Sequence, residues 1–333
     1  MTLVHEALPD CSEPDLDTRR EFLGRTLRCP LMFTAITGGT ARGREFNLAL
    51  ARAAERHGLA IGLGSQRAMA ERPEVAASFQ LRDAAPNAAI VGNIGLWQAR
   101  ALGVDGVRRL ADAIGADAIA VHLNVAQELI QPEGDRDFSG GLAAIEALAR
   151  GLGARLVVKE TGCGISPSTA RRLVEAGVET IDLAGLGGTS WIKVEALRAP
   201  GCRRTQHLGE LFAGWGIPTA PGIAALAEAL GNRATLIASG GLRDGLAIAK
   251  AIALGADVAG VALPLLKAFE AGGAAALDAC VDELIAGLRL AMVLTGARTL
   301  AALRAVPRIE GEAFARWRAG LLKALPTAAT AGG

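Results

Sequence analysis

The chain has 333 residues, of which 51% are hydrophobic, and a formal net charge of +1. So small a charge, without any run of Lys or Arg, argues against nucleic acid as a partner. The first residues do not form an apolar leader, and the sequence contains no long uncharged apolar stretch. We therefore expect neither secretion nor a membrane span. The five cysteines are scattered without a C-x-x-C pair, which predicts reduced thiols and a cytoplasmic location.

Short apolar runs that end in Gly-rich turns alternate with helical patterns along the chain. Eight such runs fit buried strands, at residues 31–35, 60–62, 89–92, 118–123, 156–160, 180–183, 236–239 and 258–261. Helical periodicity covers residues 46–57, 106–114, 141–152, 168–176 and 246–254, and four of these segments are followed at once by Gly, as at a helix C-terminus. Ser166 before Pro167 predicts a helix N-cap.

Strands that alternate with helices imply right-handed βαβ units and a parallel sheet. Eight units predict an α/β fold of the TIM (β/α)8 barrel type. The alternative, an open doubly wound sheet, would have fewer strands and a G-x-G-x-x-G motif after the first, which this chain lacks. We therefore expect one domain over residues 1–333, with an N-terminal extension at 1–30 and a C-terminal helical tail at 304–333.

The connection between the sixth and seventh strands, residues 185–233, is the longest in the predicted barrel. A long connection at the active-site face often serves as a lid or as a contact between subunits. A solvated loop is an equally reasonable interpretation of this segment.

The strand at 118–123 has an unusual end. His122 and Asn124 share one face by alternation, and Gln127 and Glu128 follow within four residues. A single histidine here would be interpreted as a strand-end residue whose ring is hydrogen-bonded within the protein and has no functional role. Four hydrogen-bonding or ligating side chains within seven positions, at the end of a barrel strand, favour a functional site instead.

Other strand ends carry polar or glycine-rich segments as well. The seventh strand ends in Ser239-Gly-Gly-Leu-Arg243 before a helix, the arrangement that binds phosphate in this fold through free backbone N–H groups. The fifth strand places Lys159 on a buried strand, where it could form a Schiff base or supply positive charge beside a flavin. The alternative is an ion pair with Glu160, although adjacent strand residues point to opposite faces.

Nine motifs occur in an order that resembles one known family. They are Thr37-Gly-Gly, Gly64-Ser-Gln-Arg, Gly92-Asn-Ile-Gly, His122-Leu-Asn-x-x-Gln-Glu, Gln131-Pro-Glu-Gly-Asp, Val158-Lys-Glu-x-Gly, Gly187-Gly-Thr-Ser-Trp, Trp215-Gly-Ile-Pro-Thr and Ser239-Gly-Gly-x-Arg. Together they are similar to the type 2 isopentenyl-diphosphate delta-isomerases, FMN-dependent enzymes of isoprenoid biosynthesis. The resemblance extends from about Leu3 to Leu266 and includes Val4-His-Glu-Ala-Leu-Pro ahead of the barrel.

The resemblance implies an FMN site and a substrate site. The residues expected to contact FMN are Ala35, Ile36, Thr37, Ser65, Asn93, Lys159, Thr189, Gly241, Leu242, Arg243, Ala262 and Leu263. The residues expected to bind substrate are Ser65, Gln66, Arg67 and Gln127, and those expected to be catalytic are His122, Asn124 and Gln127.

Glu128 is expected to hold a Mg²⁺ ion that bridges the substrate diphosphate, a role that suits a hard cation with few protein ligands. The resemblance further implies that reduced flavin acts as acid and base without net redox, that NADPH serves only to reduce it, and that the protein is a homo-oligomer, tetramer or octamer.

The sequence departs from the family at its beginning. The family has an Arg-Lys-x-x-His segment ahead of the His-x-x-Leu-Pro motif, and its cations grip the diphosphate, whereas here Met1 stands just before Val4-His5. Either the segment is missing by truncation or this chain has given up that grip. The second reading makes an FMN-dependent oxidoreductase acting on another substrate the alternative function. Ile36 in place of Met and Leu186 in place of Arg are smaller departures.

Overall fold

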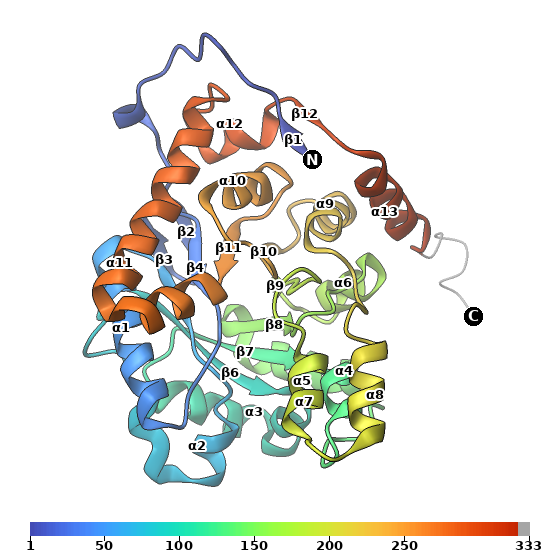
Figure 1. The fold of residues 1–333 in the computed structure, drawn as a ribbon. Coiled ribbons are helices and arrows are strands. Elements are labelled where there is room, and N and C mark those ends of the chain that lie inside the picture. Colours follow the sequence, from blue (N-terminus) through green and yellow to red (C-terminus); the bar gives the residue numbers. More distant parts are fainter. Residues whose placement is uncertain (326–333) are drawn as a thin grey trace.

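The structure is a computed structural model that describes residues 1–325. Its centre is a closed barrel of eight parallel strands, which confirms the predicted α/β TIM barrel (Figure 1). The strands follow one another around the barrel in chain order, and the last pairs with the first. They are β4 (Leu31–Phe33), β5 (Ala60–Gly62), β6 (Ala89–Gly95), β7 (Ala118–Leu123), β8 (Leu156–Glu160), β9 (Thr180–Asp182), β10 (Thr235–Ser239) and β11 (Val258–Val261).

The eight strands coincide with the eight predicted runs, with small differences at their ends. The main one is β6, which continues three residues past the predicted end because Asn93 and Gly95 remain paired with Ala120 and His122 of β7. Polar and glycine residues there had suggested a turn. The hydrogen-bonded pairing of β6 and β7 therefore continues up to the level where the polar side chains begin.

Seven helices cover the outside of the barrel: α1 (Ala41–His57), α3 (Leu96–Asp112), α5 (Gly141–Leu152), α6 (Pro167–Glu175), α9 (Thr219–Leu230), α10 (Gly245–Ala253) and α11 (Leu263–Val293). They include the five predicted ones. Ser166 Oγ accepts from Thr169 N at 3.1 Å, so the predicted N-cap of α6 is confirmed. Gly58 ends α1 with φ +64°, a left-handed conformation that glycine adopts without strain.

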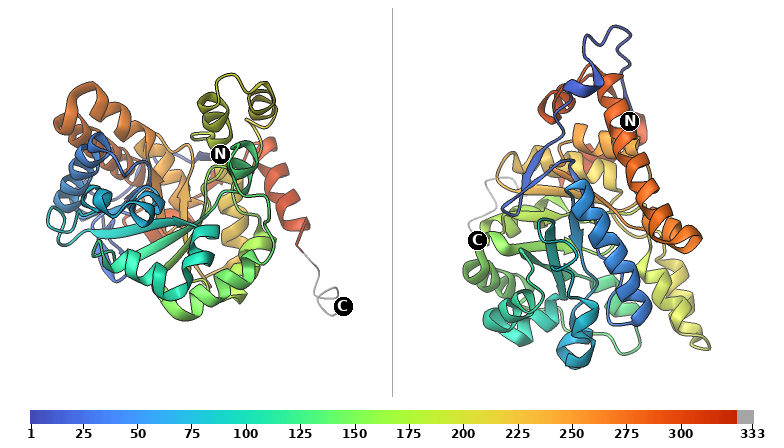
Figure 2. Two further views of the ribbon diagram at one scale, coloured as in Figure 1. Left: turned by 90° about the horizontal axis from the view of Figure 1, so that it is seen from below. Right: turned by 90° about the vertical axis from the view of Figure 1, so that its left-hand side faces the viewer.

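Shorter helices lie at the carboxyl ends of the strands, which we call the rim. They are α2 (Arg67–Glu71), α4 (Val125–Ile130), α7 (Trp191–Arg198) and α8 (Arg203–Leu211). The long connection 185–233 is thus mostly helical: α7 and α8 project from the rim while α9 returns along the barrel wall (Figure 2). A solvated loop is the wrong description of this segment.

Small apolar side chains fill the lower barrel interior, and a hairpin closes its amino-terminal end. The hairpin consists of β2 (Arg20–Phe22) and β3 (Arg25–Leu27), and its Phe22 and Leu27 are buried in the same cluster as the inward-facing barrel residues. Two ion pairs fix it to the residues that precede β11 and β7: Arg20 to Asp257 at 2.7 Å, and Arg25 to Asp117 at 2.8 Å.

The two terminal segments pair with each other beside the barrel. Strand β1 (Thr2–Leu3) is antiparallel to β12 (Arg308–Ile309), which follows α12 (Leu300–Ala305) and precedes α13 (Glu312–Lys323). Helix α13 packs against α9. The predicted tail 304–333 is thus helical only in part, and its last eight residues, 326–333, lie outside the described residues. Within the described chain, no helix is both long and apolar enough to cross a membrane.

Phe22 provides a test of the hairpin's role. The Phe22→Ala variant should lose about 3–5 kcal/mol of unfolding free energy, because the side chain is 3% exposed and its removal opens a cavity at the barrel floor. Denaturant unfolding measures this loss. Phe212→Ala is the matched control, since Phe212 is 38% exposed and should cost much less. Equal losses in the two variants would contradict the assignment of the hairpin as a structural plug.

Candidate functional site

The inward-facing residues at the upper ends of β6 to β10 are polar: Asn93, His122, Lys159, Asp182 and Ser239. They form one layer, because Lys159 is paired in register with His122 on one side and with Asp182 on the other. Hydrogen bonds join two further pairs, His122 Nδ1 to Asn93 Oδ1 at 2.9 Å and Ser239 Oγ to Asp182 Oδ1 at 2.6 Å. This polar layer lies above the apolar interior of the barrel.

Two adjoining cavities open above the polar layer. The first chamber, of about 310 Å³, lies between the loops that follow β4, β8, β9, β10 and β11. The second chamber, of about 450 Å³, lies over β5, β6 and β7 and is bounded by α2, α4 and α7. Both are within the size range of small-molecule sites. Their common wall is formed by Ala35, Ile36, Lys159, Thr161 and Trp191.

All twelve residues expected to contact a cofactor line these two chambers. Those of the first chamber are Ala35, Ile36, Lys159, Thr189, Gly241, Leu242, Arg243, Ala262 and Leu263. Those found in the second chamber alone are Thr37, Ser65 and Asn93. A single elongated ligand that spans the common wall could therefore reach all of them.

The turn after β10 has the features of a phosphate site. Gly240 and Gly241 have φ of +102° and +86°, and a Cβ on Gly241 would lie 2.5 Å from Gly187 O. Only glycine permits this close approach of two backbones. Within the described chain, the N–H groups of Gly241, Leu242 and Arg243 donate to no protein acceptor. They are therefore available to an anion.

The segment Trp215–Thr219 fixes the glycine loops of the first chamber. Ile217 N donates to Cys163 O and its carbonyl accepts from Leu186 N, both at 2.8 Å. Thr219 Oγ1 donates to Gly240 O at 2.6 Å. One short segment thus connects the loops that follow β8, β9 and β10, which accounts for a sequence motif that carries no chemistry of its own.

His122 belongs to the polar layer and lines the second chamber. Its Nδ1–H donates to Asn93 Oδ1, which leaves Nε2 as an unprotonated acceptor. Desolvation, helped by the neighbouring charge of Lys159, lowers the pKa of His122 to about 3. The imidazole is therefore neutral at physiological pH, suited to accept a hydrogen bond and unsuited to act as a cation.

Glu128 and Asn124 form a pair of oxygen-bearing side chains in the second chamber. Glu128 is 5% exposed, and its carboxylate accepts from Asn124 Nδ2 at 2.7 Å and from Asp135 N at 2.9 Å. Asn124 Oδ1 is buried and has no hydrogen-bond partner. A buried acceptor without a donor, next to a carboxylate, suits a cation or its bound water. Both residues thus fit a Mg²⁺ site.

Glu195 of α7 belongs to this site, although its sequence gave no local signal. It is 3% exposed and accepts from Gln127 Nε2 at 2.8 Å, which turns the Gln127 carbonyl oxygen away from Glu195. Arg198 NH1 is 3.3 Å from both carboxylate oxygens of Glu195. Trp191 lines the same chamber one helical turn before Glu195.

The three residues predicted to bind substrate after β5 separate in the structure. Ser65 and Arg67 line the second chamber. The Gln66 side chain is fully buried behind it, where its Nε2 donates to Leu110 O at 2.9 Å and its Oε1 accepts from Asn93 N at 3.0 Å. This geometry does not bring the Gln66 side chain to the substrate chamber, because its hydrogen-bonding groups are already used to fix the strand end.

Glu160 does not form the ion pair with Lys159 that was the alternative for that lysine. The Glu160 carboxylate points out of the barrel and accepts from Thr161 N at 2.6 Å and Gly164 N at 3.1 Å. Lys159 Nζ instead donates to the backbone oxygen of Glu160 at 2.6 Å. The lysine charge therefore remains at the junction of the two chambers.

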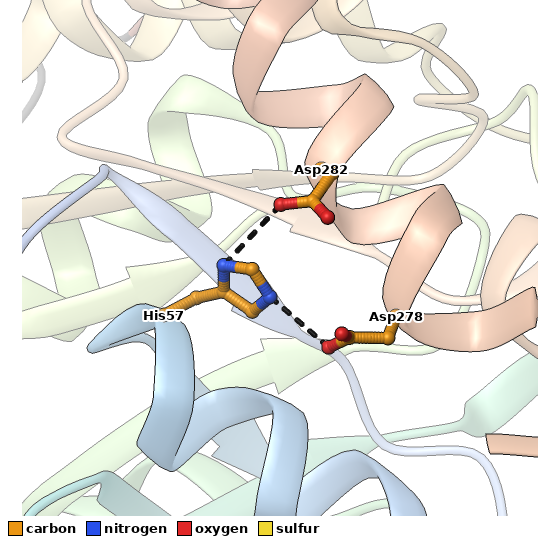
Figure 3. Close-up of side chains that lie close together, drawn as sticks. All are labelled: His57, Asp278 and Asp282. Carbon is orange, nitrogen blue, oxygen red and sulfur yellow. Dashed lines mark hydrogen bonds and ion pairs between the residues drawn. The ribbon is translucent and has the colours of Figure 1, made fainter. Parts of the chain in front are cut away.

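A second group of potential metal ligands lies outside the barrel, between α1 and α11 (Figure 3). His57 Nε2 is 3.1 Å from Asp278 Oδ1, and His57 Nδ1 is 3.8 Å from Asp282 Oδ1. Arg56 also pairs with Asp278, at 2.9 Å. With a guanidinium already on the carboxylate, the group is explained as an ion-pair network that joins the two helices.

The family match and two similar curated proteins agree on one family. The chain matches the FMN-dependent dehydrogenase family over residues 1–137 and 131–307. It is 47% identical to an isopentenyl-diphosphate delta-isomerase of Methanoregula boonei, over 91% of this chain and 84% of that protein. It is 46% identical to the isopentenyl-diphosphate delta-isomerase of Halobacterium salinarum, over 91% and 85% of the two chains.

Solved structures share the fold at lower identity. A mandelate oxidase variant with a monooxide FMN adduct has a TM-score of 0.65 and 22% identity, over 93% of this chain and 88% of that one. Mandelate oxidase with (S)-2-phenylpropionate has a TM-score of 0.64 and 21% identity, over 93% and 86%. At these identities the likeness concerns the barrel architecture alone.

The low pKa of His122 predicts a pH dependence of stability. Between about pH 6.5 and pH 3 the unfolded chain protonates this histidine while the folded chain does not, so the folded state loses up to about 1.4 kcal/mol per pH unit as the pH falls. The loss should be smaller in His122→Gln, measured by denaturant unfolding at a series of pH values. Parallel curves for the two proteins would contradict a neutral buried imidazole.

Proposed function

The chain belongs to the FMN-dependent family of the isopentenyl-diphosphate delta-isomerases of type 2, and on that premise we propose that it interconverts isopentenyl and dimethylallyl diphosphate with FMN and Mg²⁺. One observation carries the proposal. A chamber with free backbone N–H groups adjoins, across Lys159, a second chamber that holds Gln127 and Glu128. The first is suited to a phosphate-bearing cofactor and the second to a metal-bound diphosphate.

The first chamber would hold FMN. The free N–H groups of Gly241, Leu242 and Arg243 would bind its phosphate, and the α10 dipole would add to their attraction for an anion. Lys159 at the common wall would place a positive charge beside the ring system, where it stabilises an anionic reduced flavin. When bound, reduced FMN supplies a proton donor and acceptor at its ring edge, and NADPH serves as its reductant.

The second chamber would bind the diphosphate through Mg²⁺. Glu128 would ligate the ion and Asn124 Oδ1 would accept from one of its waters. Arg67 and Ser65 line the same chamber, where they would contact phosphate oxygens. The Glu195 carboxylate holds the Gln127 amide in one orientation, which leaves its carbonyl oxygen free to accept from a ligand. The neutral His122 adds a second fixed acceptor.

The common wall of the two chambers would also shield the hydrocarbon part of the substrate from water. Its apolar residues are Ala35, Ile36 and Trp191, next to Lys159. An isopentenyl tail lying there would be surrounded by side chains that do not compete for its protons. Proton transfer to and from carbon is aided by such exclusion of water.

Glu128→Gln tests the metal role. This variant should lose more than about a hundredfold of its Mg²⁺-dependent turnover of isopentenyl diphosphate, beyond the loss typical of residues that only orient a ligand. Its flavin absorption should be unchanged, because Glu128 lines the second chamber only. Glu133→Gln, a change of an exposed carboxylate in the same connection, is the control. Full activity in Glu128→Gln would overturn the metal assignment.

Consumption of NADPH distinguishes the isomerase from the alternative oxidoreductase. The reduced wild-type protein should convert many equivalents of isopentenyl diphosphate while it oxidises no further NADPH, since the reaction has no net redox change. Anaerobic turnover followed at 340 nm and by product analysis gives both quantities. NADPH oxidation in proportion to product, or no isomer formed, would favour the oxidoreductase.

A further inference from the structure

Asp182 is a buried carboxylate that the proposed reaction leaves without a role. It is 2% exposed, on β9, in the polar layer below the two chambers. Removing a carboxylate from water costs several kcal/mol unless charges and donors compensate it. The hydrogen-bond donors and charges around Asp182 therefore decide whether a carboxylate is tolerated at this depth.

Two neutral donors contact Asp182, and both belong to the rim. Ser239 Oγ donates to its Oδ1 at 2.6 Å, and Ala184 N donates to the same oxygen at 3.1 Å. Ala184 has φ of +40°, a conformation that non-glycine residues rarely adopt, so the Asp182 contact holds a strained turn. These two bonds position the carboxylate but supply no positive charge.

Lys159 supplies that charge. It is paired in register with Asp182 on the neighbouring strand, both side chains point into the barrel, and both line a small cavity of about 10 Å³ beneath the chambers. The other nearby carboxylate, that of Glu160, faces the opposite way and accepts from loop N–H groups. Asp182 is thus the carboxylate that lies beside the lysine inside the barrel.

Opposed effects act on the ionisation of Asp182. Burial raises its pKa above the ordinary value, while the Lys159 charge and the two donors act to lower it. An ionised carboxylate at this depth is stabilised by the charge of its lysine neighbour.

We propose that Asp182 acts through Lys159 as a positioning residue: it is the buried counter-charge beside the ammonium group, which Glu160 O fixes by a hydrogen bond, and it limits how much of the lysine charge a bound flavin feels. The inference rests on the proposed function, because it concerns the cofactor assigned to the first chamber. It adds a role for a residue that lines neither chamber and reaches the phosphate turn only through Ser239.

The consequence concerns the balance between oxidised and reduced flavin. A positive charge near the ring binds the anionic reduced form more tightly than the neutral oxidised form. Removing the counter-charge leaves Lys159 uncompensated, so the preference for reduced flavin should increase. For one unit charge at the distance of neighbouring strands, the change in the ratio of the two dissociation constants is on the order of tenfold.

The test uses Asp182→Asn in the full chain, which keeps the shape and an acceptor oxygen but removes the charge. We expect its midpoint potential for FMN to rise, and the ratio of oxidised to reduced FMN dissociation constants to increase by the factor above. In Lys159→Met the same Asp182→Asn change should have no such effect, because no ammonium group remains to be compensated. A shift of equal size in both backgrounds would contradict the proposal.

Two further variants separate charge from folding. Thr180→Val alters the same face of β9 two residues earlier, and it should leave the potential unchanged. Ser239→Ala removes the neutral donor at 2.6 Å but keeps the carboxylate charge, so it should leave the potential close to the wild-type value. No shift in Asp182→Asn, or a shift of equal size in Ser239→Ala, would overturn the inference. Failure of the wild-type protein to bind FMN would instead overturn the proposed function.

Discussion

The alternation of side chains along parallel strands is the constraint on which the site depends. In a closed barrel every second residue points inward, and the inward-pointing residues stack in layers along the barrel axis. Here the lower interior is filled by small apolar side chains such as Ala60 and Ala118, sealed below by Phe22. The next layer contains His122, Lys159 and Asp182. On five strands the inward-facing side chains change from apolar to polar at this height. The top of the packed core is therefore also the floor of a binding site.

Contacts between the loops that follow the strands form the walls of the first chamber above this floor. Gly241 approaches Gly187 so closely that a Cβ on Gly241 would lie 2.5 Å from Gly187 O, and Thr219 ties Gly240 to the start of α9. Because these loops are held in place, the free N–H groups of the β10 turn belong to residues that line the first chamber in a fixed arrangement. A preorganised anion site of this kind does not have to be ordered when its ligand binds.

Charge in the site is balanced locally, in pairs of neighbouring side chains. Arg198 faces Glu195 within α7, and Arg67 of α2 pairs with Glu71 at 2.7 Å. In the barrel interior Asp182 lies beside Lys159. His122 stays neutral because Lys159 is close and water is excluded, so it adds no further positive charge. An anionic cofactor and an anionic substrate can therefore be bound in neighbouring chambers without a large excess of buried charge.

The sequence alone determined the eight strands, their order and the residues at their carboxyl ends, because apolar periodicity, glycine C-caps and polar strand ends are local signals. The twelve expected cofactor residues all line the two chambers for the same reason. Tertiary structure decided what local signals do not carry. Helix α7 brings Glu195 onto Gln127 from 68 residues away. The Gln66 side chain is buried because it accepts a hydrogen bond from Asn93 N of β6. The register of β8 and β9 places Asp182 beside Lys159. Such contacts depend on how distant segments pack, which no pattern within one segment specifies.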